Sequence, residues 1–315
     1  MREAKSENLM DRAERLVGLE FENPIINKIG NPIDFEMMQK IWKDFESFGW
    51  EIEYEKNIEN RISGVTKEFK EGFIELVSDS GGCNLELALP PMKNLDNAKT
   101  FYEKIRGEIV EVLKKNNLSL LAVGLQPGIV ENVDKIRVQW KLYDAFIKMG
   151  ASDYYSTCMM VASSAHQVGV SVSIKEAVKI ANELTKVSGL IVALCGNSAI
   201  NNWEVLPWKE WRVLGWDFRM ASNTPGFETL SGYPEKEFKS LAAYIKYFWD
   251  RPWMILPLNR GGEWVLPKEK INYLEYFKNE EIEAETLEGE KIKLIPTMND
   301  INFATIIMWP FSKIH

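Results

Sequence analysis

Apolar and polar residues follow two different periods along this chain, and these periods predict both strands and helices. Strict alternation over residues 17–22 and 84–89 predicts two strands, because successive side chains of a strand point to opposite faces of a sheet. Apolar residues spaced three and four apart predict amphipathic helices over 35–48, 94–116 and 174–194. Since these elements are mixed without a regular strand–helix–strand order, the expected fold class is α+β.

Shorter segments complete the predicted set of elements. Local apolar runs between turn residues predict strands at 51–54, 73–78, 118–125 and 168–172, and helices at 1–16 and 235–248. A polar, charged connection is expected between residues 54 and 73. Near the end of the chain, Glu288-Gly289 predicts the turn of a hairpin.

Two of the predicted strands carry acidic residues on one side only. In Gly18-Leu19-Glu20-Phe21-Glu22, alternation places both glutamates on one face and both apolar side chains on the other. Asn84-Leu85-Glu86-Leu87 divides in the same way, with the asparagine and the glutamate on the polar side. The pattern therefore predicts two strands with an acidic face and an apolar face.

Carboxylates held close together repel, and each raises the pKa of the others, so such a group is costly unless a cation neutralises it. Magnesium is a hard cation that prefers oxygen ligands. The acidic strands therefore indicate a magnesium site. A lone pair of acids on a strand is also typical of an antiparallel sheet that turns one face to water, and the pattern by itself leaves this alternative open.

Composition excludes several other classes of protein. The 315 residues carry a net charge of -8, so no basic surface is available to bind a nucleic acid backbone. The longest apolar stretches fall far short of the roughly 20 residues that cross a bilayer. The charged N-terminus has no apolar signal-peptide core. We therefore expect a cytoplasmic protein with neither nucleic acid nor a membrane as a partner.

Cysteine and histidine usage limits the metal chemistry. The chain has 3 cysteines and 2 histidines, and none of the cysteines forms a C-x-x-C pair. This argues against a zinc site and for reduced thiols. Any bound metal should be a hard cation held by oxygen atoms.

Several short segments, taken in order, resemble the plant-like and bacterial glutamate–cysteine ligases. A G-x-E-x-E strand, an acid with a glycine pair, and an F-E-L strand of that family resemble Gly18 to Glu22, Asp79 with Gly81-Gly82, and Leu85-Glu86-Leu87. Later family segments resemble Gly124-Leu125-Gln126-Pro127, Gln167-Val168-Gly169, Asn197-Ser198-Ala199 with Arg212, and Pro296-Thr297-Met298-Asn299-Asp300 followed by 303–310. The likeness runs from about residue 17 to residue 315.

The resemblance implies a glutamine-synthetase-like catalytic architecture, in which helices pack on the apolar face of a curved, mainly antiparallel sheet. It implies a single catalytic domain over residues 1–315 that holds ATP and magnesium ions. The implied reaction phosphorylates a carboxylate, commonly that of glutamate, and an amine such as that of cysteine then displaces phosphate to leave an amide. Such phosphoryl transfer needs positioned charge rather than a protein nucleophile.

The candidate site residues combine the acidic strands with this resemblance. The proposed metal ligands are Glu20, Glu22 and Glu86, with Asp79 and His166 as weaker candidates. The residues expected to contact the nucleotide are Gln167, Asn197 and Arg212, and the expected catalytic cations are Arg212 and Lys313. Alternation places Gln167 on the polar face and His166 on the core side, where a hydrogen-bonded packing role is the alternative. For Arg212, the alternative to a role in the site is an ordinary position on the surface.

The chain also departs from the family pattern. Ala162 and Gly169 stand where the family has arginine and asparagine, Lys313 stands where arginine is common, and the sequence stops at His315, where relatives continue through a helical region. Three interpretations stay open: a ligase with an altered acid or amine substrate, a true glutamate–cysteine ligase with local substitutions, or a non-catalytic or nucleotide-binding partner subunit that retains the fold. The expected substrates are amino acids or amines, and a homo-oligomer or a partner chain that completes the site is left open.

Overall fold

The computed structural model describes residues 15–55, 60–128, 130–136, 144–145, 148, 160–214, 231–232, 234, 236–250, 256–257, 264–269, 271–297, 300 and 309–310. The chain divides into two compact units. Unit 1 comprises Met1–Val138, Cys158–Ile174 and Gly196–Arg212, and unit 2 comprises Gln139–Thr157, Lys175–Cys195 and Val213–His315. Nearly all of the helix predicted at 1–16 lies outside the described residues, and the single catalytic domain stays a prediction.

A seven-stranded sheet forms the centre of unit 1, and all of its pairings are antiparallel. Its strands are β1 (Val17–Ile26), β2 (Glu51–Tyr54), β3 (Ile62–Phe69), β4 (Gly72–Ser78), β5 (Asn84–Ala88), β6 (Ser119–Leu120) and β7 (His166–Val170). The strand order is β2-β3-β4-β5-β1-β6, and β7 also pairs with β1. Strand β1 is therefore central: β5 lies along one edge, and the other edge is shared by β7 and β6.

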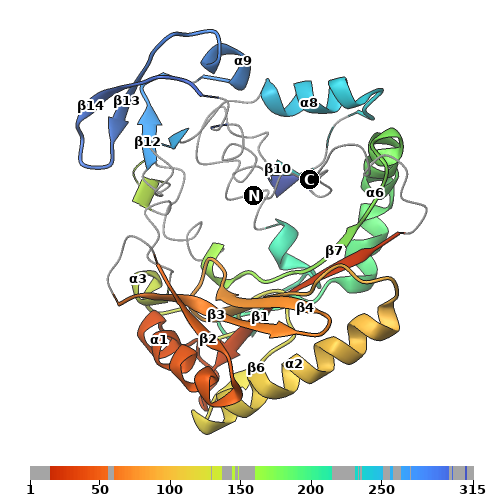
Figure 1. Ribbon diagram of the computed structural model, residues 1–315, viewed down its shortest axis with the longest axis vertical. Helices are drawn as coiled ribbons and strands as arrows, with labels where there is room; N and C mark the ends of the chain where they lie inside the picture. Colours follow the sequence, from red (N-terminus) through yellow and green to blue (C-terminus); the bar gives the residue numbers. More distant parts are fainter. Residues whose placement is uncertain are drawn as a thin grey trace. The chain divides into compact units, whose positions relative to one another are not determined.

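Helices cover one face of this sheet. Helix α1 (Phe35–Asp44), the short 3-10 helix η1 (Phe45–Phe48) and helix α2 (Leu95–Lys115) lie on the same side of it (Figure 1). Asp34 and Asn94 cap α1 and α2 by accepting hydrogen bonds from the first-turn amides. Gly49, which has a φ of 76°, ends η1 in the left-handed conformation that glycine adopts without strain.

The core of unit 1 fills the space between these helices and the sheet. The fully buried side chains include Met38, Ile41, Trp42 and Phe45 from the helical layer, and Ile74, Leu76 and Leu85 from the strands. Leu19 and Phe21 of β1 pack against the same cluster, and the Phe21 ring stacks on Tyr102 of α2. The apolar face predicted for the acidic strands is thus the face that the helices cover.

Short elements complete the described part of unit 1. These are α3 (Val133–Ile136) and the hairpin of β8 (Ile200–Asn201) and β9 (Glu204–Val205). The segment around Leu125 bridges to Ser163, and Gln126 donates its backbone N–H to the carbonyl of Ala162 at 2.8 Å. These contacts hold the residues that precede β7.

Unit 2 contains its own antiparallel sheet and two longer helices. The sheet is formed by β11 (Leu256–Pro257), β12 (Trp264–Pro267), β13 (Ile282–Thr286) and β14 (Lys291–Leu294), in that order. The remaining elements are α6 (Ile174–Cys195), α8 (Leu241–Trp249), α9 (Tyr273–Tyr276), and the parallel pair β10 (Ser231–Gly232) and β15 (Trp309–Pro310).

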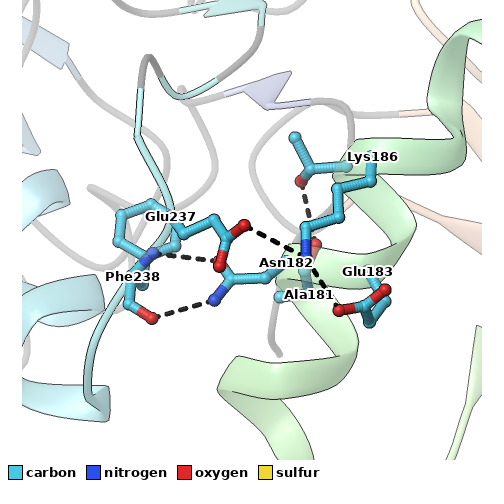
Figure 2. Close-up of polar contacts among 7 residues, drawn as sticks. Ala181, Asn182, Glu183, Lys186, Glu237 and Phe238 are labelled. Atoms are coloured by element: carbon cyan, nitrogen blue, oxygen red, sulfur yellow. Dashed lines mark hydrogen bonds and ion pairs between the residues drawn. The ribbon is translucent and has the colours of Figure 1, made fainter.

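Polar contacts fasten the segment before α8 to α6 (Figure 2). The side-chain amide of Asn182 donates to the carbonyl of Phe238 at 2.8 Å and accepts from its N–H at 3.0 Å. Lys186 forms ion pairs with Glu183 at 2.9 Å and with Glu237 at 3.0 Å. Because the lysine pairs are exposed, the amide clamp is the contact that fixes this segment.

The structure confirms the α+β class, the three long helices, the acidic strands and the hairpin at Glu288-Gly289. It corrects three expectations. A full strand, β3, runs through the predicted polar connection; the strand predicted at 118–125 shortens to β6; and the helix predicted from residue 235 begins at Leu241. Among the described residues, no helix combines the length and the apolar character needed to cross a bilayer.

Two residues of β4 should contribute differently to the stability of the fold. Leu76 is 0% exposed and Phe73 is 57% exposed, on opposite faces of the strand. We expect Leu76→Ala to lower the free energy of unfolding by roughly 2–5 kcal/mol, because it removes buried apolar area and leaves a cavity. Phe73→Ala should change it by less than about 1 kcal/mol. Urea unfolding of both variants measures the difference, and equal losses would contradict this placement of the core.

Candidate acidic metal and nucleotide site

Four carboxylates gather on the sheet face that α1 and α2 do not cover. Glu20 and Glu22 project from β1, Glu86 projects from β5, and Asp79 follows the last residue of β4. In the register of β1 with β5, Glu22 lies directly opposite Glu86. Because directly paired residues of a sheet share a face, the two acidic strands bring their carboxylates together as the alternation predicts.

Strand β7 adds an amide to this acidic face. Gln167 lies opposite Glu20 in the antiparallel register of β1 with β7. Its side-chain nitrogen donates to Glu20 Oε1 at 2.7 Å and to Glu22 Oε1 at 2.9 Å. One amide therefore joins two neighbouring carboxylates, and the predicted orientation of Gln167 is confirmed.

The segment before β7 holds the other oxygen of Glu22. The backbone N–H of Ala165 donates to Glu22 Oε2 at 2.7 Å, and the backbone N–H of Glu22 donates to the Ala165 carbonyl at 2.9 Å. Both oxygens of Glu22 are thus held by donors, and the residue is only 9% exposed. This fixes the direction in which the carboxylate can offer its remaining lone pairs.

Burial and mutual repulsion oppose the ionisation of these acids. Burial, and next the charge of Asp79, raises the pKa of Glu22 to about 8. Burial, and next the charge of Glu20, raises the pKa of Glu86 to about 8. The pKa of Glu20 is raised by burial and by Asp79, and that of Asp79 is raised by burial. The four groups therefore form one electrostatically coupled cluster, which we call the carboxylate group.

The chemistry of the carboxylate group fits a hard divalent cation. A bound cation would offset the repulsion that raises these pKa values, and carboxylate oxygens are its preferred ligands. Within the described ranges, no three histidine, cysteine or acidic side chains stand close enough together to hold one ion. Pairs of these carboxylates would be enough for magnesium, which commonly takes one or two carboxylates and completes its shell with water and substrate phosphates.

His166 is not brought together with the carboxylates. It lies opposite Phe21 in the register of β1 with β7, and its ring meets the Phe21 ring edge-on at 5.1 Å. The Asn23 side-chain nitrogen lies 3.5 Å from His166 Nε2. Burial, and next the nearby positive charge of Arg212, lowers the pKa of His166. The histidine therefore points to the face that carries Phe21, and its side chain is exposed there.

The side chains of Arg212 and Asn197 each donate to the main chain of unit 1. Arg212 Nη1 donates to the carbonyl of Ser164 at 3.0 Å, and its Nε lies 3.5 Å from Glu210 Oε1. The side-chain amide of Asn197 donates to the carbonyl of Ala122 at 2.7 Å. The structure thus brings Arg212 to the segment that holds Glu22, whereas Lys313 lies outside the described residues.

Two contributors were absent from the predicted set of site residues. Glu75 of β4 adds to the repulsion that raises the pKa of Glu86. Its alternation with Asp79 along 75–79 is a signal in the sequence that could have found it. The sequence carries no such signal for the backbone N–H of Ala165, because the contact of this N–H with Glu22 depends on the register between distant segments.

A comparison with known families identifies the class of the chain. The model of a family described as glutamate-cysteine ligase family 2 (GCS2) matches residues 17–249, which is more than half of the chain and includes the whole carboxylate group. A search of curated proteins finds no significant match.

The raised pKa values predict that stability without divalent cations falls as the pH rises. Glu86 binds its proton more tightly in the folded chain, so its favourable contribution is complete below about pH 4.5 and is lost as the pH rises to about 8. Glu86→Gln should therefore be more stable than the wild type at pH 8, by roughly 4 kcal/mol, with the difference vanishing toward pH 4.5.

Denaturant unfolding at several pH values, in the presence of a chelator, measures this difference. Glu68→Gln is the matched control, because Glu68 is an exposed glutamate on the same face of the sheet. A stability difference for Glu86→Gln that does not change with pH would refute the raised pKa of Glu86.

Proposed function

Because the chain belongs to glutamate-cysteine ligase family 2, we propose that it is an ATP-dependent, magnesium-requiring ligase that joins a carboxylic acid to an amine. Family membership supports a glutamate–cysteine ligase-like ligase in general. The proposal adds the nucleotide, the metal and the reaction course, together with a glutamine-synthetase-like use of the sheet. The observation that carries it is the carboxylate group on the uncovered face of the sheet in unit 1.

The chemistry asked of the protein is positioning and charge neutralisation. A carboxylate oxygen of the acid substrate attacks the γ-phosphorus of ATP, the bond to the bridging oxygen breaks, and ADP leaves. The amine nitrogen then attacks the acyl carbon, phosphate leaves, and the nitrogen loses a proton to give the amide. Magnesium, when bound, supplies Lewis-acid neutralisation of the phosphate oxygens. No side chain needs to form a covalent bond.

The residues of this chain have separate tasks in the proposal. Glu20, Glu22, Glu86 and Asp79 are assigned as oxygen ligands of magnesium ions, with no more than two of them to any one ion. Gln167 holds Glu20 and Glu22 in one orientation and lies on the face where the nucleotide phosphates must approach. We assign Arg212 and Asn197 to supporting this face next to the nucleotide, and Lys313 keeps its proposed role toward phosphate or the substrate carboxylate.

The acid substrate is the least constrained part of the proposal. Ala162 takes the place where the family resemblance expects an arginine, and it is buried with Leu125 in a small apolar cluster that Trp211 contacts. A substrate carboxylate therefore finds no cation at this position. We favour a ligase with an altered acid or amine over a true glutamate–cysteine ligase.

The competing proposal is a non-catalytic or nucleotide-binding subunit that retains the ligase fold. Such a chain would carry the cost of four mutually repelling carboxylates without using them in turnover. The raised pKa values of Glu22 and Glu86 favour the enzyme, because an unneutralised acidic cluster destabilises the fold at neutral pH.

Turnover tests the proposal directly. We expect ADP release with Mg-ATP and at least one acid–amine pair from a panel that includes glutamate and cysteine, and no release after magnesium is chelated. Glu20→Gln and Glu86→Gln should each lower the rate by more than about a hundredfold, because each removes charge that neutralises the phosphates. Glu68→Gln, the matched exposed control, should keep the wild-type rate. Equal rates in the wild type and both site variants would remove the metal assignment.

Ligand-induced stabilisation separates the enzyme from a subunit that has lost its site. A ligand that binds only the folded chain raises its melting temperature. We expect Mg-ATP to raise the melting temperature of the wild type, and we expect ATP with chelator to raise it much less. In Glu22→Gln, most of the magnesium-dependent rise in melting temperature should be lost. A wild-type chain that Mg-ATP stabilises but that releases no ADP with any pair would favour the nucleotide-binding subunit.

A further inference from the structure

A buried asparagine lies between two members of the carboxylate group. Asn84 is the first residue of β5 and is 1% exposed. Its main chain closes the turn after β4, because its carbonyl accepts from the Asp79 N–H at 3.1 Å and its N–H donates to the Gly81 carbonyl at 2.8 Å. These main-chain bonds tie Asn84 to the turn that carries Asp79.

The same side chain reaches the segment that holds Glu22. We call residues Ser163 to Ala165 the strap. Asn84 Nδ2 donates to the Ser163 carbonyl at 2.8 Å, and the Ser164 hydroxyl donates to Asn84 Oδ1 at 2.9 Å. Ala165, the last residue of the strap, donates its N–H to Glu22 Oε2. A continuous chain of hydrogen bonds therefore connects Asp79 to Glu22 through Asn84.

Both ends of this side-chain amide are hydrogen-bonded to the strap. Its nitrogen donates to the Ser163 carbonyl, and its oxygen accepts from the Ser164 hydroxyl. The side chain is therefore a connector rather than a ligand. Groups that orient metal ligands in this way control metal affinity, and their loss typically weakens it by about 10- to 100-fold.

We propose that Asn84 is a positioning residue that holds Asp79 and Glu22 at the separation the divalent cation requires. This inference rests on the proposed function, because it deepens the metal site of that reaction. The sequence placed Asn84 on the polar side of its strand, but it gave no sign of the strap that the amide binds.

The test compares Asn84→Ala with a structural control. Gln39 of α1 makes an equivalent pair of amide contacts, donating to the Ile62 carbonyl at 2.9 Å and accepting from its N–H at 2.8 Å, on the face covered by helices. Gln39→Ala therefore removes a similar pair of hydrogen bonds away from the carboxylate group. Both variants should melt at a lower temperature than the wild type, because each leaves main-chain groups without their partners.

Magnesium dependence distinguishes the two roles. In Asn84→Ala, the magnesium concentration for half-maximal ADP release should rise about tenfold or more. The same increase should appear in the magnesium titration of thermal stability at fixed ATP, which requires no turnover. The KM of the amine substrate should stay at its wild-type value, and Gln39→Ala should keep the wild-type magnesium dependence. Ser164→Ala, which removes one contact of Asn84, should show a smaller increase in the same direction.

Each possible result either supports or overturns the positioning role of Asn84. A wild-type magnesium dependence in Asn84→Ala, or an equal increase in Gln39→Ala, would overturn the positioning role while leaving the proposed function intact. If Asn84→Ala does not fold, Ser164→Ala becomes the test variant. A wild-type magnesium dependence in Ser164→Ala would then overturn the positioning role of Asn84. A wild-type chain with neither magnesium-dependent stabilisation nor ADP release would overturn the proposed function, and this inference with it.

Discussion

Repulsion among four partly buried carboxylates is the constraint on which the rest of unit 1 depends. Such groups separate or take up protons unless the fold holds them and a cation neutralises them. Here Glu22 and Glu86 are paired across two adjacent strands, so the hydrogen bonds of the sheet itself prevent their separation. The opposite face supplies the compensating stability, because the same strands bury Leu85 and Leu87 beneath α1 and α2.

The donors around the carboxylates come from a different part of the chain. Gln167 and the N–H of Ala165 approach from the segment at and before β7, and Arg212 contacts the preceding carbonyl of Ser164. These donors favour the charged form of the acids, but they do not outweigh burial, since the pKa of Glu22 remains raised. The protein orients its carboxylates without fully neutralising them, which leaves the remaining charge for a cation.

Alternation in the sequence predicted the parts of the site that depend on one strand alone. The shared face of Glu20 and Glu22, the polar side of Glu86, and the opposite directions of Gln167 and His166 all follow from a period of two residues. Strand β3 was missed because its alternation is interrupted: Lys67 lies on the face covered by helices, where it pairs with Glu108, and Gly64 lies on the carboxylate face. The register between distant segments, which joins the strap to Glu22, cannot be read from local periodicity.

Gly64 shows why that strand depends on its neighbours rather than on its own residues. A Cβ atom at this position would lie 2.3 Å from the Leu76 carbonyl oxygen of β4, so only glycine permits the approach of the two strands. Glycine weakens the intrinsic preference for a strand, and the pairing of β3 with β4 and β2 must offset this. The outer strands thus keep β4 in place, and β4 leads directly into Asp79. The packing of a strand without acidic ligands therefore fixes where one member of the carboxylate group lies.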